Sequence, residues 1–280
     1  MPKHPYPHRP SFVELLDLEE IDRDLFRGMN EFPNRERTTL YGGQVAAQAL
    51  KAAGMTVSEG RHPHSLHGYF LRAGRRELPV IFKVDRDRDG NSFSARRVSA
   101  VQEGEVIFDM TASFHIDRTG LEYTVPIRQV DIAPEDCIEE AYANSFPAAE
   151  AHPVPPLRVT PFGEKISPII WCRVRERLPD DRLTHCCALT YLSDISSGFA
   201  GPDIPDIPPG GSSLDHAMWF RGPIRADGWC LLDMTPMMAG GSRGLYKGAM
   251  HAREGTLGAM LTQEVLFRNR DAPVPPAAPG

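Results

Sequence analysis

The chain has 280 residues, of which 41% are hydrophobic and 24% charged, and its formal net charge is −6. This length allows one large domain or two smaller ones around a sizeable core. The negative net charge gives nucleic-acid binding no general electrostatic support. No apolar run approaches the roughly 20 residues of a membrane helix. We therefore expect a globular protein with neither a nucleic-acid partner nor a membrane span.

The cysteines indicate a reducing compartment. There are five, they are scattered along the chain, and no CxxC pair suggests zinc. The N-terminal residues MPKHPYPHRP lack the apolar stretch of a signal peptide. We expect a cytoplasmic protein that needs no metal and no cofactor.

The N-terminal part of the chain predicts one helix followed by a sheet. Residues 1–24 are expected to form a tail and a short helix, opened by a capping box at Ser11 and Glu14 and running to about Ile21. Residues 25–116 form the first folded half. In it, a helix after Gly42-Gly43 places small and apolar side chains on one face, which predicts close packing; they are Val45, Ala46, Ala49, Leu50 and Ala53.

Three strands are predicted after this helix, at about residues 79–85, 93–101 and 106–114. Hairpin turns are expected at residues 88–91 and at Glu103-Gly104. In the last strand, a period-2 row faces the core; its members are Val106, Phe108, Met110, Ala112 and Phe114. One helix followed by antiparallel strands indicates the α+β class.

The remainder of the chain divides into a connection, a second half and a tail. Residues 117–166 are proline-rich and are predicted to be a long connection with a short helix near residues 135–143. Residues 167–268 form the second half, with a strand near 169–177, a helix near 181–196 and further strands. Residues 269–280 are expected to be a disordered tail.

The second half repeats the first. His67 and His216 are 149 positions apart, as are Arg72 and Arg221, whereas the turns at Glu103 and Glu254 are 151 apart. An insertion of two residues aligns the halves and suggests duplication of a unit of roughly 100 residues. Because the two histidines match, we interpret both as structural rather than catalytic.

Two polar residues interrupt apolar rows of the second half. Gln263 takes the place of Ala112 in the repeat, and Asp194 ends the stripe that begins with Leu183 in the predicted helix. A buried amide or carboxylate needs partners. Gln263 is either a core residue satisfied by backbone or a group facing a cavity. Asp194 is either in solvent at the helix end or part of a site, to which the loop hydroxyls of Ser212 and Ser213 are candidates to contribute.

Long motifs in a fixed order resemble the type II acyl-CoA thioesterases, a TesB-like family related to the peroxisomal enzymes. The resemblance covers about Leu25 to Arg268 and rests on TTLYGGQVAAQALKAAG, HSLHGYFLRAG, RDGNSFSARRVSAVQEGEVIFDMTASF, LDHAMWFRGPIRADGWCLLD and EGTLGAMLTQE. It implies a double hotdog fold, two fused helix-plus-sheet repeats that form one continuous sheet. It also implies hydrolysis of fatty acyl-CoA to fatty acid and CoA.

The resemblance further implies an Asp, a hydroxyl and a Gln as catalytic residues, which by motif position are Asp194, Ser213 and Gln263. Asp194 is expected to act as general base on a water that Ser213 and Gln263 position. Gly42 and Gly43 are expected to let backbone approach the substrate. A cluster of basic residues that includes Arg96 and Arg97 is expected to meet the phosphates of CoA.

Two other functions stay open at this stage. One is a hotdog enoyl-CoA hydratase or dehydratase, for which Asp215-His216 supplies the residue types, although neighbouring strand residues point to opposite faces. The other is a catalytically silent acyl-CoA-binding protein. For any of the three we expect a homo-oligomer, a dimer or a tetramer.

Overall fold

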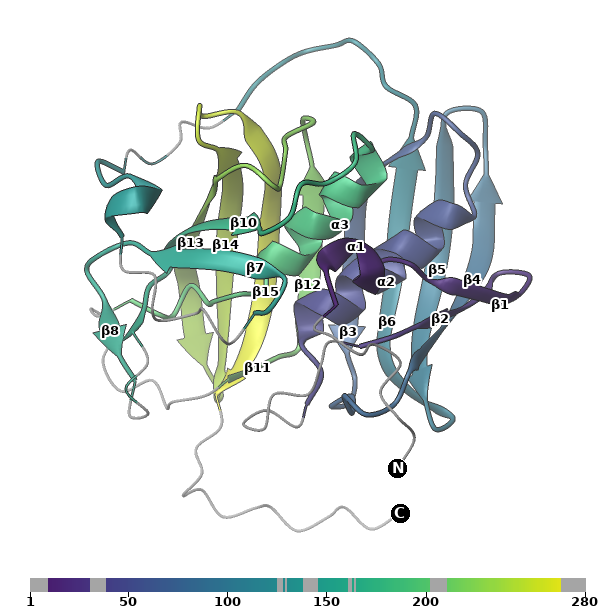
Figure 1. Cartoon of the computed structure of the whole chain (residues 1–280), viewed down its shortest axis with the longest axis horizontal. Helices are drawn as coiled ribbons and strands as arrows, with labels where there is room; N and C mark the ends of the chain where they lie inside the picture. The colour runs from purple at the N-terminus through teal and green to yellow at the C-terminus, as the bar shows by residue number, and fades with distance from the viewer. Residues whose placement is uncertain are drawn as a thin grey trace.

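The computed structural model describes residues 10–30, 39–124, 128, 130–137, 146–160, 163, 165–201 and 211–267. In this part of the chain, thirteen strands form one sheet in the order β1-β2-β4-β5-β6-β3-β12-β15-β14-β13-β10-β7, and β11 pairs with β15. Helices α2 and α3 lie side by side across one face of it (Figure 1). The expected α+β double hotdog is therefore confirmed.

The two halves share a core order of a strand, a helix and four strands, to which the first half adds α1 and β1 and the second adds β11. The first half comprises α1 (Phe12–Leu15), β1 (Glu19–Asp22), β2 (Leu25–Gly28), α2 (Gly42–Met55), β3 (His62–Phe70), β4 (Val80–Asp89), β5 (Phe93–Gln102) and β6 (Glu105–His115). The second comprises β10 (Ile169–Val174), α3 (Arg182–Leu192), β11 (Gly211–Ser213), β12 (Asp215–Phe220), β13 (Cys230–Gly240), β14 (Arg243–Ala252) and β15 (Leu257–Phe267).

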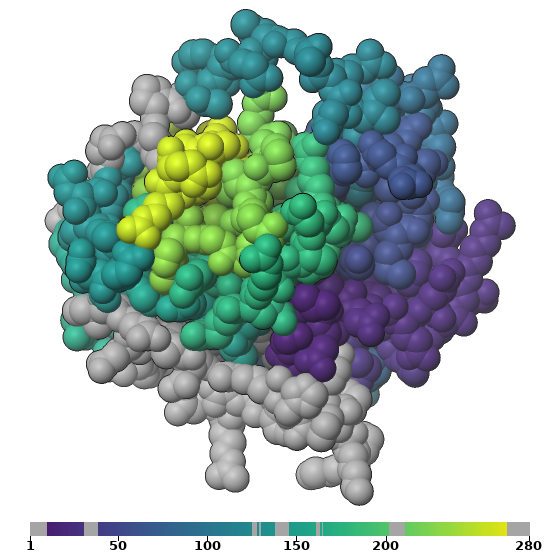
Figure 2. Space-filling view, turned by 45° about the horizontal axis from the view of Figure 1, so that its top comes forward, coloured from purple at the N-terminus to yellow at the C-terminus, as the bar shows by residue number. Residues whose placement is uncertain are grey.

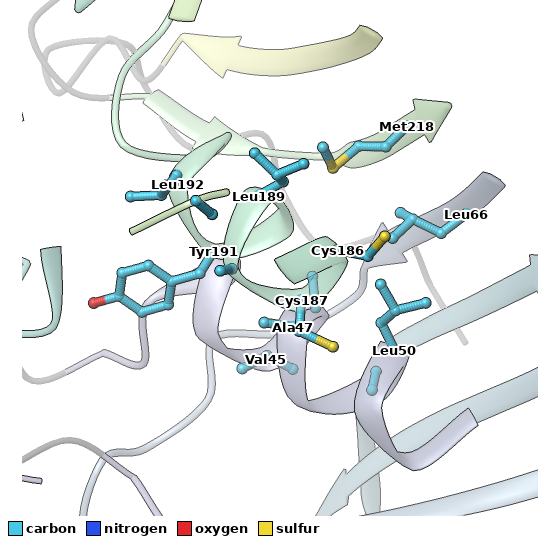
Figure 3. Close-up of a cluster of buried hydrophobic side chains, with 14 of the residues drawn as sticks. Val45, Ala47, Leu50, Leu66, Cys186, Cys187, Leu189, Tyr191, Leu192 and Met218 are labelled. Carbon is cyan, nitrogen blue, oxygen red and sulfur yellow. The ribbon is translucent and has the colours of Figure 1, made fainter. Parts of the chain in front are cut away.

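Helices α2 and α3 pack so closely because α2 presents small residues. A Cβ atom at Gly54 would lie 2.4 Å from a methyl group of Leu183, and one at Gly43 would lie 2.6 Å from the carbonyl oxygen of Tyr191. Figure 3 shows Val45, Ala47 and Leu50 of α2 facing Cys187 and its neighbours on α3. The five residues of the predicted face are buried, as expected. The closest approach to the helix of the other half is made by Gly43 and Gly54, which that prediction did not include.

The halves join through β3 and β12, which pair antiparallel from Asp215↔Tyr69 to Trp219↔Ser65. This seam makes the sheet continuous. In the space-filling view, the first half (purple and blue) and the second half (green and yellow) lie side by side, and the chain after β6 passes over them at the top (Figure 2).

The expected connection contains ordered structure. It holds a 3-10 turn, η1 (Pro134–Asp136), and the strands β7 (Ala149–Pro153), β8 (Arg158–Val159) and β9 (Lys165–Ile166). β7 extends the main sheet beyond β10. The helix predicted near residues 135–143 is replaced by η1 at its start, and residues 138–143 lie outside the described part. So do residues 1–9 and 268–280, including the predicted C-terminal tail.

Two predicted helices are too long. The capping box of Ser11 and Glu14 is present, but α1 ends at Leu15, because residues 19–22 pair with β2 as strand β1. Helix α3 ends at Leu192, and Ser193 is its C-cap. Asp194 therefore lies just beyond the helix and not on its apolar stripe.

Strand pairing corrects the alignment of the two histidines. Gly68 pairs with Met110 in the first half, and Met218 pairs with Leu261 in the second. Since Met110 corresponds to Leu261 in the repeat, Gly68 corresponds to Met218, an offset of 150. His67 thus matches Ala217, and His216 matches Leu66. This one-residue shift places the histidines on opposite faces: His67 is exposed and His216 is buried.

Replacing Leu50 by Ala tests the packing between the helices. Leu50 is fully buried, so the variant should lose about 2–5 kcal/mol of unfolding free energy, measured by urea denaturation. Met55→Ala is the control, because Met55 lies on the same helix and is 42% exposed. Equal losses in the two variants would contradict this account of the core.

Candidate functional site

The side chains predicted from the sequence meet beside the N-terminus of α2. Asp194 follows α3, Ser213 ends β11 and Gln263 lies in β15. Ser213 Oγ donates to Asp194 Oδ1 at 3.2 Å, and Gln263 Nε2 donates to the same oxygen at 2.9 Å. Gln263 Nε2 also donates to Ser213 Oγ in a short contact. The expected trio is thus one hydrogen-bonded cluster.

The first half supplies the opposite wall of this cluster. The backbone N–H of Gly43 donates to Asp194 Oδ2 at 2.9 Å. Tyr41, the N-cap residue of α2, makes no side-chain cap bond, so Asp194 caps the helix from the other half of the protein. The positive end of the helix dipole favours a negative group at this position.

Glycine is required at the start of α2. A Cβ atom at Gly42 would lie 2.7 Å from Asp194 Oδ2 and 3.0 Å from the Phe70 ring. Both glycines therefore contact the acidic group itself. In this structure the Gly43 N–H is committed to Asp194, so Gly43 positions the carboxylate rather than offering that N–H to a substrate.

Asp194 has capacity for one more hydrogen bond. Among the described residues, three donors reach its carboxylate: Gly43, Ser213 and Gln263. An ionised carboxylate offers about four acceptor positions. The described residues thus leave one position for a water molecule, and a carboxylate that holds a water beside a hydroxyl and an amide can serve as a general base.

Gln263 is buried, at 1% exposure, and the hydrogen-bond partners of its side chain are other side chains rather than backbone groups. Its Oε1 lies 2.8 Å from His216 Nδ1 and accepts from the Tyr246 hydroxyl at 2.6 Å. His216 Nε2 lies 2.8 Å from Ser193 Oγ. We interpreted His216 from the sequence as structural, and we did not identify Tyr246, whose signal was its buried place in the alternating row of residues 243–252.

The hydrogen-bond donors of Arg96 are used within the protein. It is 1% exposed, and its guanidinium donates to Thr56, to Asp89 and to the carbonyls of Arg88 and Ala95. These contacts engage all three of its nitrogens, leaving no donor for a phosphate. The structure therefore gives no support to the expected CoA contact of Arg96, which joins the hairpin of β4 and β5 to the end of α2.

Arg97 points the other way. Successive strand residues face opposite sides of a sheet, so Arg97 lies on the face away from the helices, 51% exposed and 3.0 Å from Asp85. Asp194, in contrast, meets the end of α2 on the helical face. Neither arginine is placed at the cluster around Asp194.

Burial lowers the pKa of five described histidines below the ordinary value of 6.5; they are His62, His64, His185, His216 and His251. In each, removal from water penalises the charged imidazolium. These rings therefore stay neutral in the folded protein at pH values where they are protonated in the unfolded chain.

This difference predicts that acid weakens the fold. As the pH falls below about 6.5, the unfolded state binds protons that the folded state does not, so the free energy of unfolding decreases. Urea denaturation at pH 7.5 and at pH 5.5 measures the effect. Carboxylates titrate mostly near pH 4 and contribute little in this window. A stability that rises toward pH 5.5 would contradict the prediction.

Comparisons with known proteins identify both halves. Residues 33–115 match the family described as the acyl-CoA thioesterase N-terminal domain, and residues 134–267 match the acyl-CoA thioesterase C-terminal domain. The chain is 36% identical to acyl-coenzyme A thioesterase 8 of Homo sapiens, over 91% of this chain and 88% of that protein. It is 33% identical to acyl-CoA thioesterase 2 of Haemophilus influenzae, over 92% and 97%.

A solved structure shows the same likeness. The crystal structure of the acyl-CoA thioesterase II TesB2 from Mycobacterium marinum has a TM-score of 0.78 and 38% identity, covering 92% of this chain and 98% of that one. Within the described residues, no helix is long and apolar enough to span a bilayer.

Proposed function

The chain belongs to the acyl-CoA thioesterase family, whose members hydrolyse thioesters, and on that premise we propose that Asp194, Ser213 and Gln263 carry out the hydrolysis of acyl-CoA to fatty acid and CoA. The observation that supports this assignment is the carboxylate of Asp194, which three donors from both halves hold and which keeps one acceptor position. No covalent intermediate with the protein is required.

In the proposed reaction, a water molecule takes the remaining position on Asp194 and is oriented by Ser213 and Gln263. The water oxygen attacks the thioester carbonyl carbon while Asp194 accepts a proton. The tetrahedral intermediate then expels the thiolate of CoA, which takes the proton back from Asp194, and the fatty acid is released. Orientation of the water lowers the entropic part of the barrier. We assign stabilisation of the oxyanion to backbone N–H groups at the start of α2 other than that of Gly43, which is bonded to Asp194.

A hydratase mechanism gains no support from this arrangement. His216 bonds to Ser193 and Gln263, whereas Asp215 accepts from the backbone N–H of Glu264. The sequence neighbours Asp215 and His216 thus do not form an acid–base pair. A crotonyl-type enoyl-CoA, assayed for loss of enoyl absorbance, tests this interpretation, and a fast loss would favour the hydratase.

We also propose a cytoplasmic protein that forms a homo-oligomer. The five cysteines are all unpaired thiols, and four of them are buried, which suits a reducing compartment.

The homo-oligomer has its own support. The outer face of the sheet at the β3–β12 seam carries large exposed side chains, with Tyr69 at 63% and Trp219 at 43% exposure, as at many subunit contacts. Sedimentation measures the assembly state.

Replacing Asp194 by Ala should reduce kcat by roughly 10²- to 10⁴-fold, the usual contribution of a general base. The assay follows CoA release with a thiol reagent across short to long acyl chains. Asp109→Ala is the control, since Asp109 lies in β6 and bonds to Ser99. An Asp194 variant with near-normal kcat would refute the assignment, and binding without release by the wild type would indicate a silent acyl-CoA-binding protein.

Gly42→Ala should retain the fold but lower kcat by about 10²-fold, because the new methyl group displaces the Asp194 carboxylate and small displacements in an active site are that damaging. Gly120→Ala is the matched control, since a Cβ atom there meets nothing within 4 Å. Circular dichroism verifies folding. Full activity of Gly42→Ala would show that the close contact is dispensable.

A further inference from the structure

The Gln263 side chain has two ends with different partners. Its amide nitrogen faces Asp194 and Ser213, while its oxygen faces His216 and Tyr246. The nitrogen must be the end beside Asp194, because an ionised carboxylate only accepts hydrogen bonds. Rotation of the amide by half a turn would place oxygen against the carboxylate and remove the donor to Ser213.

The groups behind Gln263 both donate to it. Burial raises the pKa of Tyr246, so its phenol stays protonated. Burial lowers the pKa of His216, so the ring is neutral with one N–H. Gln263 Oε1 only accepts hydrogen bonds, so the ring N–H is on Nδ1, 2.8 Å away, and points at this oxygen. Nε2 is then an acceptor, 2.8 Å from the hydroxyl of Ser193, which also lies 2.9 Å from the carbonyl oxygen of Thr190.

The direction of donation is the same throughout this network. His216 and Tyr246 donate to Gln263, and Gln263 donates to Asp194 and Ser213. Hydrogen bonds that run in one direction strengthen one another. The network ends at the carboxylate that the proposed function uses.

The first half provides an internal comparison. The positions equivalent to His216, Gln263 and Tyr246 hold Leu66, Ala112 and Arg96. Arg96 pairs with Ala112 as Tyr246 pairs with Gln263. A hotdog half therefore folds with apolar residues at the first two positions. The polar set is present in the half that contains Asp194, which argues that it serves the site rather than the fold.

We propose that His216 and Tyr246 are positioning residues, which hold the Gln263 amide in the one orientation that directs its nitrogen toward Asp194 and Ser213. This inference rests on the proposed function of those three residues. His216 and Tyr246 act through Gln263 and do not touch the substrate.

The kinetic test uses Tyr246→Phe and His216→Leu. The first removes only a hydroxyl, and the second installs the residue that the first half carries at the same position. Each variant should lower kcat about 3- to 10-fold, the effect of one hydrogen bond, and leave KM within about twofold. In a Gln263→Ala background, neither substitution should reduce kcat further. Equal losses in both backgrounds, or a change confined to KM, would overturn the proposal.

A second readout does not depend on activity. Selective ¹⁵N labelling of glutamine shows the side-chain amide of Gln263, assigned by its absence from the spectrum of Gln263→Ala. Both variants should shift its two proton signals and speed their exchange. Unchanged signals in both variants would also overturn the proposal. If the wild type releases no CoA from any acyl-CoA, the proposed function fails, while the amide signals still decide whether these residues hold Gln263.

Discussion

The contact between the start of α2 and Asp194 is the constraint on which the site depends. Helix α2 belongs to the first half and Asp194 to the second, yet the backbone of Gly43 donates to the carboxylate. This contact requires the two helices to approach closely, which in turn requires glycine at positions 43 and 54 and alanines along α2. The composition of a buried helix face thereby sets the position of an acidic group.

The duplication allows the two halves to specialise. At equivalent positions on the inner face of the sheet, the first half has Leu66, Ala112 and Arg96, and the second has His216, Gln263 and Tyr246. Arg96 reaches Thr56 at the end of α2 and Asp89 in the hairpin, a structural role. The corresponding place in the second half carries the hydrogen-bond network of the site. The same backbone thus supports a closed core in one half and a polar cluster in the other.

Much of this arrangement was predictable from the sequence. The period-2 rows, the turns and the small face of α2 are local patterns, and in the first half they correctly predicted α2, β4, β5 and β6 but not β1, β2 or β3. Gln263 and Asp194 stood out because polar groups in apolar rows need partners. The ends of α1 and α3 were not predictable, since strand pairing and a C-cap decide them. The contact of His216 with Gln263 depends on strand register. A shift of one residue in the alignment moves a side chain to the opposite face of the sheet. The burial of Arg96 was not predictable either, because a charged residue usually lies at the surface.

The seam between β3 and β12 has a consequence for synthesis of the protein. β12 begins 145 residues after β3 ends, from Phe70 to Asp215. At about 5–20 residues per second, the ribosome needs roughly 7 to 30 s to supply the missing neighbour. During that interval the nascent first half has an open strand edge, able to pair with another chain. Correct folding therefore requires that the free edge of β3 does not pair with another chain before the second half has been translated.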